Sequence, residues 1–171
     1  MPTAATAVRP TVRRAGVDDA ATVHTLLVEL AEHEGTAHAV RAGVDDWRRM
    51  LADPDVVVLL ADVDGAPAGY VSGVRQLNLW LGRDILAMDD LYVRPAARDR
   101  GVGGQLMAAL AEHVVDLARV TGQDLVVTWG VRADNEAGQR FYRRLGARLR
   151  TKVVASWQPR DYRDHLRRAR A

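Results

Sequence analysis

The stretch DILAMDDLYVRPAARDRGVGGQLM, residues 84–107, decides the fold of this 171-residue chain. Its first part, Ile85 to Arg94, is rich in apolar, β-branched and aromatic residues, which is typical of a buried strand. Pro95 ends that strand because proline has no N–H group for the ladder. A glycine-rich turn around Gly101 then opens a helix whose apolar residues recur at helical spacing, at Leu106, Leu110, Val114 and Leu117. The stretch therefore predicts a strand, a tight turn and a helix.

The glycine-rich turn is a candidate anion site. The first turn of a helix has unpaired N–H groups and the positive end of the helix dipole, and both favour a phosphate. Arg98 and Arg100 add charge, and arginine can bind phosphate oxygens through two parallel hydrogen bonds. A P-loop would need a lysine after Gly104, and a dinucleotide fingerprint would need a glycine at the position of Leu106. The turn therefore indicates a phosphate or pyrophosphate site of a different kind.

Two motifs carry a resemblance to a known family. Arg98, Gly101 and Gly103 form R-x-x-G-x-G after a strand ending in LYVRP, which resembles the acetyl-coenzyme A motif of the GNAT acyltransferase superfamily. The segment NEAGQRFYRRLGA, residues 135–147, is similar to the superfamily's N-x-x-A-x-x-F-Y-x-x-L-G-F/A. Gly138 replaces the usual alanine, which weakens a helix by about 1 kcal/mol. The alternatives are a helix entry without a ligand and, for the second motif, ordinary helix packing.

The resemblance implies a binding site for acetyl-coenzyme A along the strand end and the turn. The turn would hold the pyrophosphate, and the backbone groups of Tyr92 and Val93 would pair with the pantetheine amides as an added strand does. A free N–H near Leu91 would stabilise the developing oxyanion. The implied cofactor-binding residues are Leu91, Tyr92, Val93, Arg98, Asp99, Arg100, Gly101, Val102, Gly103, Gly104, Asn135 and Tyr142.

Within the superfamily, the chain looks most like the spermidine/spermine (diamine) acetyltransferase branch. The segments that carry this likeness are ELAEHE, residues 29–34, and LGRDILAMDDLYV, residues 81–93. Asp89 stands where that branch has glutamate, and the resemblance favours it as the base, acting directly or through a water. Asp90 faces the other side of the strand unless a bulge intervenes, and it either holds a substrate charge or is structural. Tyr142 is the implied proton donor to the departing thiolate, so that transfer is direct, without an acyl-enzyme.

The acceptor is expected to be a primary amine. Glu29, Glu32 and Glu34 form either a solvated helix end or a rim that attracts cations. In the second interpretation, Glu29, Glu32 and Asp90 bind a small, cationic, polyamine-like substrate. The alternatives are an antibiotic or a protein amine as acceptor, or a non-catalytic module that binds acyl-coenzyme A.

The whole chain is expected to form an α/β (α+β) fold with a mixed, mostly antiparallel central sheet flanked by helices, which matches the GNAT fold. Asp64-Gly65 is a strong hairpin turn between the early strands. The first helix is expected to bury Ala20, Val23, Leu27, Leu30 and Ala31. The expected strands are residues 8–15, 56–63, 68–79, 85–94, 125–131 and 147–157. We expect one acetyltransferase domain over residues 1–171, with a core of 8–158 and tails at 1–7 and 160–171.

Composition narrows the setting and the partners. The net charge of +2 favours no particular partner, and the arginine-rich end, residues 160–170, is interpreted as a solvated helix or tail. There are no cysteines, and the five histidines lack metal-ligand spacing, so no metal is expected. Neither a signal peptide nor a long apolar stretch is visible, which predicts a cytoplasmic protein. The resemblance implies a homodimer, which would also cover the edge of the last strand. Nucleic acid and membrane partners are not expected.

Overall fold

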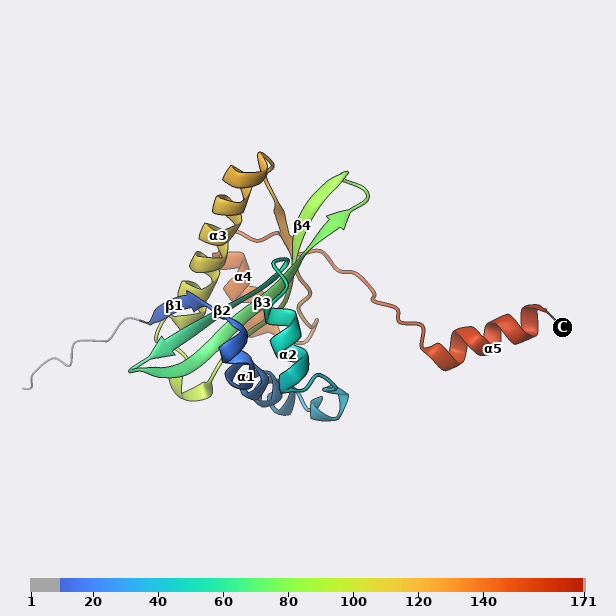
Figure 1. Cartoon of the computed structure of the whole chain (residues 1–171), viewed down its shortest axis with the longest axis horizontal. Helices are drawn as coiled ribbons and strands as arrows, with labels where there is room; N and C mark the ends of the chain where they lie inside the picture. Colours follow the sequence, from blue (N-terminus) through green and yellow to red (C-terminus); the bar gives the residue numbers. More distant parts are fainter. Residues whose placement is uncertain (1–9, 171) are drawn as a thin grey trace, which may run out of the picture. The chain divides into compact units, whose positions relative to one another are not determined.

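The computed structural model describes residues 10–170, which form two compact units that meet between Gly130 and Val131. The first unit contains a five-stranded sheet in the order β1-β2-β3-β4-β5 (Figure 1). All neighbours are antiparallel except β4 and β5, which are parallel. The strands are β1 Thr11–Arg14, β2 Val56–Val63, β3 Ala66–Asn78, β4 Arg83–Val93 and β5 Val126–Thr128. The expected mixed, mostly antiparallel sheet is therefore confirmed.

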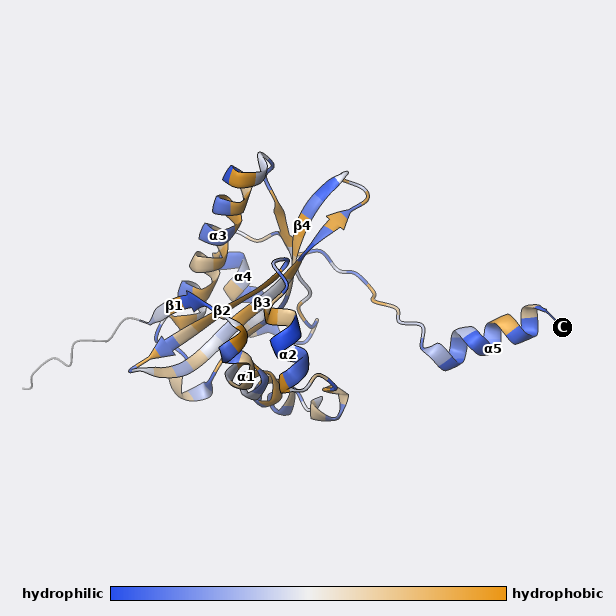
Figure 2. Ribbon diagram, in the orientation of Figure 1, coloured by the Kyte–Doolittle hydropathy of each residue, from blue (hydrophilic) through white to orange (hydrophobic). Residues whose placement is uncertain are grey.

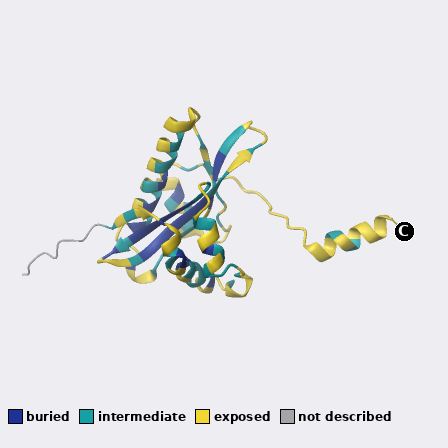
Figure 3. Cartoon of the chain, viewed as in Figure 1, coloured by how far each residue is buried: buried dark blue, intermediate teal, exposed yellow. Residues whose placement is uncertain are grey.

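Helices cover both faces of this sheet. One face packs against α1 (Ala20–His33) and α2 (Val44–Leu51), and the other packs against α3 (Val102–Thr121), as Figure 1 shows. Short 3-10 turns lie at Val17–Asp19, Ala37–Ala39 and Pro95–Ala97. Because both faces are covered, β2 reads as the nearly continuous apolar run VVVLLADV. Figure 3 shows the buried residues concentrated along the middle strands.

The core on the α1 and α2 side joins residues from distant parts of the chain. Tyr70 of β3 and Tyr92 of β4 lie there with ring centroids 6.5 Å apart. Their buried neighbours are Ala15, Ala20, Val23, Leu26, Trp47, Val58 and Leu60. On α1, Leu26 is buried while the expected Leu27 and Leu30 are only half-buried, because they line a pocket described below.

The β2–β3 connection is the predicted hairpin turn. Asp64 and Gly65 have φ values of 54° and 78°, and both are positive, as a two-residue turn matching the strand twist requires. The sequence prediction at this point is confirmed.

A β-bulge interrupts β4 at Asp89 and Asp90. Val71 pairs with Leu91, but Gly73 pairs with Met88, so that Ser72 alone faces two residues of β4. Because of the extra residue, the even-numbered side chains of β4 lie on one face of the sheet before the bulge and on the other face after it. It therefore decides which face each aspartate can reach.

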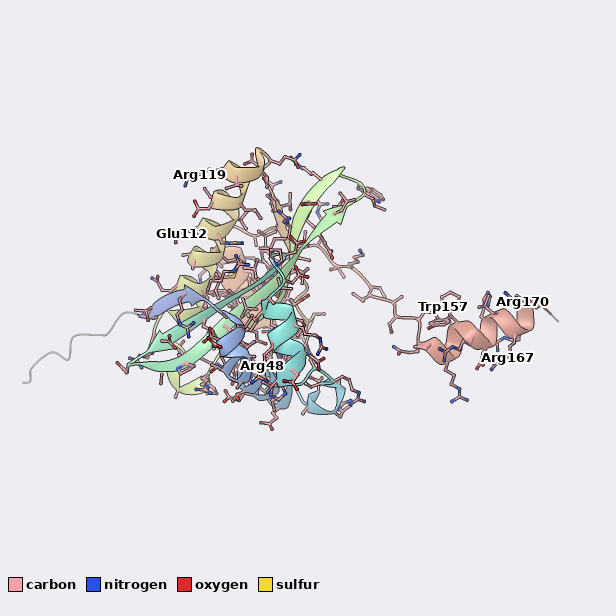
Figure 4. The ribbon with its side chains drawn as sticks, in the orientation of Figure 1. Arg48, Glu112, Arg119, Trp157, Arg167 and Arg170 are labelled. Carbon is pink, nitrogen blue, oxygen red and sulfur yellow. The ribbon has the colours of Figure 1, made fainter. Side chains whose placement is uncertain are left out.

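The second unit contains α4 (Glu136–Arg144) and α5 (Pro159–Ala169). Figure 2 shows that α5 is largely hydrophilic, and Figure 4 shows Arg167 and Arg170 on it. The ring of Trp157 lies 6.3 Å from that of Tyr162 and 5.3 Å from that of His165. Of the two alternatives for residues 160–170, a helix or a tail, the structure contains the helix.

Three strand predictions need correction or restriction. The expected last strand, residues 147–157, is wrong: this described segment has no regular secondary structure and is not part of the sheet. The strand expected over 125–131 is shorter, Val126–Thr128. The first strand is Thr11–Arg14, and residues 8 and 9, like the expected tail at 1–7, lie outside the described residues. An apolar pattern fits a pleated surface, but it forms a strand only where a neighbour supplies the ladder. The single-domain expectation stays a prediction.

Candidate active site

The bulge gives the two aspartates of β4 different surroundings. Asp90 is half-buried on the α1 side, where its Oδ2 accepts a hydrogen bond from the Tyr70 hydroxyl at 3.1 Å and one from Ser72 Oγ at 3.5 Å. Asp89, its neighbour, is exposed. The sequence left open whether a bulge would place these residues, and the structure contains one.

Both carboxyl groups hold protons more tightly than usual. Burial raises the pKa of Asp90, the nearby charges of Asp89 and Glu34 raise it further, and the bonds from Tyr70 and Ser72 oppose this shift. The pKa of Asp89 is also raised, by partial loss of water around its carboxyl group. Burial and the negative charge of Asp90, with smaller contributions from Glu34 and Asp89, raise the pKa of the Tyr70 phenol, which therefore stays protonated as a donor. A carboxylate with a raised pKa is a stronger base, as removal of an amine proton requires.

A pocket of about 270 Å³ opens beside Asp90. It lies between α1, the Ala37–Ala39 turn with the residues after it, and β4. The lining residues are Leu27, Leu30, Ala31, Glu34, Thr36, Ala39, Val40, Arg41, Ala42 and Asp90. The pocket thus combines apolar walls with two carboxylates and one guanidinium group.

The three glutamates at the end of α1 lie in different surroundings. Both oxygens of Glu29 accept hydrogen bonds from Arg94, at 2.8 Å to Nε and 2.7 Å to Nη2. Glu32 is exposed, and Glu34 lines the pocket. An arginine of the same chain therefore already pairs with the Glu29 carboxylate, and a role of Glu29 in substrate binding stays a prediction.

Sequence analysis named Glu34 only as a member of the cation-attracting rim, without assigning it to the substrate site, and it did not name Tyr70 at all. A signal for Glu34 existed: Leu27, Leu30 or Ala31, and Glu34 are spaced three or four residues apart, which puts them on one helix face. Tyr70 had no such signal, because it lies 20 residues from Asp90 and reaches it only across the sheet.

The turn before α3 has the backbone shape that its sequence suggests. Asp99 and Gly101 have positive φ values, 59° and 79°. Val102 is buried and fixes the start of α3, while Gly103 and Gly104 follow in its first turn, where N–H groups have no acceptor within the helix. The turn can therefore offer backbone donors to an anion.

The two arginines of the turn have partners within the first unit. Arg98 Nε donates to the carbonyl oxygen of Val93 at 3.0 Å, and its Nη2 lies 3.4 Å from His33 Nε2. Arg100 forms an ion pair with Asp64 at 3.3 Å. Both arginine side chains are exposed. A phosphate bound at the turn would therefore compete for them with hydrogen bonds and an ion pair that water can already reach.

One edge of β4 is open next to the bulge. β5 pairs with β4 only over Ile85–Ala87, so that, among residues 10–170, the later part of β4 has no strand neighbour on that side. The N–H of Arg94 donates to Ala68 on β3, so alternation turns the backbone groups of Leu91 and Val93 toward the open edge. The carbonyl of Tyr92 instead faces Gly69 of β3. The predicted pairing with pantetheine therefore suits the backbone of Leu91 and Val93 better than that of Tyr92, and it stays a prediction.

The remaining expected site residues belong to the second unit. Asn135 caps α4, its Oδ1 accepting from the Gly138 N–H at 2.8 Å. Tyr142 is buried, and its ring lies 5.3 Å from that of Phe141. The functions of both residues toward the cofactor stay predictions.

Residues 10–170 contain neither a cluster of side chains suited to a metal ion nor a helix suited to a membrane. This part of the chain contains no group of three or more histidine, aspartate or glutamate side chains placed to hold a metal ion. None of its helices combines the length and apolarity needed to cross a membrane.

Solved structures with the same fold are mainly acetyltransferases. An aminoglycoside acetyltransferase from an uncultured soil metagenomic sample superposes with a TM-score of 0.73 at 13% identity, covering 87% of this chain and 95% of that one. AAC(6')-Iy, solved with a bisubstrate analog containing coenzyme A, gives a TM-score of 0.69 at 19% identity, with 88% and 98% covered. At these identities the likeness establishes the fold alone.

The sequence matches the family model described as "Acetyltransferase (GNAT) family" over residues 20–147, and the chain belongs to this family. It is an N-acetyltransferase, and acetyl-coenzyme A is the acetyl donor in this family. Among curated relatives, thialysine N-epsilon-acetyltransferase of Bos taurus is 28% identical over 146 residues, covering 80% of this chain and 82% of the relative. L-ornithine N5-acetyltransferase of Arabidopsis thaliana is 29% identical over 101 residues, covering 58% and 42%. The expected resemblance is therefore confirmed.

Proposed function

We propose that this N-acetyltransferase transfers the acetyl group directly to a primary amine of a small cationic substrate, polyamine-like in its charge. The observation that carries the proposal is the position of Asp90, which lines the pocket and lies beside the open edge of β4. Glu34 adds a second negative charge to the same pocket. A charge pair about 4 Å apart is worth about 1 kcal/mol in water and more in a partly closed cleft.

The residues around the bulge support the chemistry of this transfer. Acetyl-coenzyme A supplies the acetyl group as a thioester, and an amine attacks a thioester only after losing its proton. Asp90, or Asp89 acting through a water, accepts that proton, helped by its raised pKa. The N–H of Leu91 on the open edge donates to the oxygen that gains charge. Tyr142 is the proposed proton donor to the sulfur.

The size of the pocket favours small acceptors. At about 270 Å³ it lies below the range of about 300–1,000 Å³ that encloses drug-sized ligands. The names of two relatives, a thialysine N-epsilon-acetyltransferase and an L-ornithine N5-acetyltransferase, refer to terminal amines of small molecules. A small amine is therefore favoured over an aminoglycoside or a protein amine.

The test is a screen of amines with acetyl-coenzyme A that measures released thiol. The panel contains diamines, polyamines, amino acids with side-chain amines, aminoglycosides and a peptide with a free N-terminus. We expect turnover with small amines and strong loss of it in Asp90→Asn and Glu34→Gln. Glu112→Gln is the matched control, because Glu112 is exposed on α3 (Figure 4). Turnover restricted to the peptide or the aminoglycosides would reject the proposal.

The cofactor assignment is tested separately at the turn. Gly103→Val should block close approach of an anion to the first N–H groups of α3 and weaken acetyl-coenzyme A binding sharply. Calorimetry on folded protein checks this expectation. Unchanged affinity would remove the turn from the cofactor site.

We also propose that the protein is a homodimer. Residues 147–157 form no strand, so covering the edge of a final strand gives no reason for dimerisation. The proposal now depends on the resemblance and on three exposed apolar side chains, Val153, Val154 and Trp157, which are 90%, 87% and 61% exposed. A sedimentation mass near one 18.8 kDa chain would reject it. A cytoplasmic location stays a prediction.

A further inference from the structure

The pocket beside Asp90 contains one positive group that an amine site does not need. Arg41 lines it together with Glu34 and Asp90. An arginine in a site for a purely cationic substrate would repel that substrate. Its presence indicates that the ligand also carries a negative charge.

The charges of Glu34 and Arg41 are not neutralised by ion pairs within the described chain. Arg41 Nη1 donates to the carbonyl oxygen of His38 at 2.8 Å, which uses one of its five donors. Within residues 10–170, neither Arg41 nor Glu34 forms an ion pair, whereas Glu29 on the same helix as Glu34 is fully paired. The free donors of Arg41 match the planar geometry of a carboxylate.

The walls between these charges are apolar. Leu27, Leu30, Ala31, Ala39 and Val40 contribute aliphatic surface to the lining. Such a surface suits a chain of methylene groups, and the volume of about 270 Å³ suits one small molecule. The pocket therefore fits a short aliphatic chain with charged groups at its ends.

We propose that the acceptor is an α-amino acid with a terminal side-chain amine, bound with its carboxylate on Arg41, its α-ammonium on Glu34 and its reacting amine at Asp90. This inference rests on the proposed acetylation of a small amine, and it replaces the polyamine-like charge of the acceptor with the mixed charge of an amino acid. The amine nitrogen forms a bond to the acetyl carbon while the carbon–sulfur bond breaks. The proton lost by the amine passes to the carboxylate, and the thiolate takes up one proton. A diamine with the same chain lacks the carboxylate and brings a second positive charge toward Arg41.

The experiment compares amines that differ only in the carboxylate. L-lysine is set against 1,5-diaminopentane, L-ornithine against 1,4-diaminobutane, and L-lysine methyl ester removes the negative charge while keeping the chain. We expect kcat/KM to be at least tenfold higher for an amino acid than for its decarboxylated partner. Arg41→Gln should remove this preference, lowering kcat/KM for the amino acid about tenfold or more without lowering it for the diamine. Arg41→Lys should restore part of the preference.

Arg48→Gln is the matched control, because Arg48 is exposed on α2 and is absent from the pocket lining (Figure 4). Its kinetics should equal those of the wild type, and the melting temperature of Arg41→Gln should be unchanged. Equal kcat/KM for amino acids and diamines, or an Arg41→Gln enzyme that keeps the preference, would overturn the carboxylate site and leave amine acetylation standing. Absence of turnover with every small amine would overturn the proposed function as well.

Discussion

The pairing of Glu29 with Arg94 allows a prediction that separates stability from catalysis. Arg94 binds Glu29 through two nitrogens, at 2.8 and 2.7 Å, and donates from Nη1 to the carbonyl oxygen of Pro67 at 2.6 Å. Arg94 directly follows β4, so these bonds connect the end of β4 to α1 and to the start of β3. Glu29→Gln removes the charge and leaves one acceptor oxygen, so the change is mild in shape.

The magnitude follows from the geometry and the exposure of the pair. A hydrogen bond to a charged group contributes about 1.5–3 kcal/mol. The two side chains are 33% and 31% exposed, so water replaces part of the loss. We expect the free energy of unfolding to fall by about 1–2 kcal/mol, which lowers Tm by about 2–8 °C for a chain of this size.

The assay is thermal and urea unfolding of Glu29→Gln, Arg94→Gln and the double variant, together with KM for the amine. The double-mutant cycle should show a coupling energy, because the two residues are in direct contact. Glu32→Gln, exposed on the same helix, should change stability by less than about 0.5 kcal/mol. An unchanged Tm for Glu29→Gln combined with a raised amine KM would refute this reasoning and return Glu29 to the acceptor site.

Four further predictions concern the sheet and the titratable residues. Asp90→Asn should raise stability at pH 7 while removing activity. Burial raises the pKa of Asp90 above 3.8, so the free energy of unfolding of the wild type falls as pH rises from 3.8 through the pKa in the folded state. Urea unfolding at several pH values should therefore show that the stability difference between variant and wild type vanishes at low pH. Asp19→Asn should behave oppositely, because Arg13 and the Gly16 N–H lower the pKa of Asp19, and its stabilisation is lost as pH falls. Gly69→Ala should destabilise by about 3 kcal/mol or more in urea unfolding, since the new Cβ would lie 2.3 Å from the Tyr92 carbonyl oxygen, whereas Gly104→Ala has open space and should gain about 0.5–1 kcal/mol. Tyr142→Phe should lower kcat about 10²-fold with less effect on KM for acetyl-coenzyme A, and a change in KM alone would make Tyr142 a binding or packing residue.

The sequence was most informative where local signals agree. The strand, turn and helix of residues 84–107 are present as Arg83–Val93, a turn with positive φ at Gly101, and Val102–Thr121. Gly122, with φ of 70°, ends that helix, as glycine commonly does after the last helical turn. Each of these features is encoded within a few residues of where it occurs.

The candidate site was less predictable because its parts meet only after folding. Arg94 lies 65 residues from Glu29, and no spacing rule connects them. Arg41 lies in a loop whose path is set by the packing of α1 and α2, so its place beside Asp90 was invisible in the sequence. The prediction of a strand over residues 147–157 was wrong for a related reason. A strand depends on a neighbouring strand, and the apolar pattern alone does not supply one.

The bulge at Asp89 and Asp90 makes the site depend on the number of residues in β4 as well as on their chemistry. Before the bulge, the even-numbered residues Leu86 and Met88 lie on the same face of the sheet as Val71. After the bulge, the even-numbered Tyr92 lies on the opposite face, together with Tyr70. Deleting Asp89 would leave both ends in their present register and convert the bulge into a regular ladder. The hairpin should therefore survive a one-residue deletion that abolishes acetyl transfer.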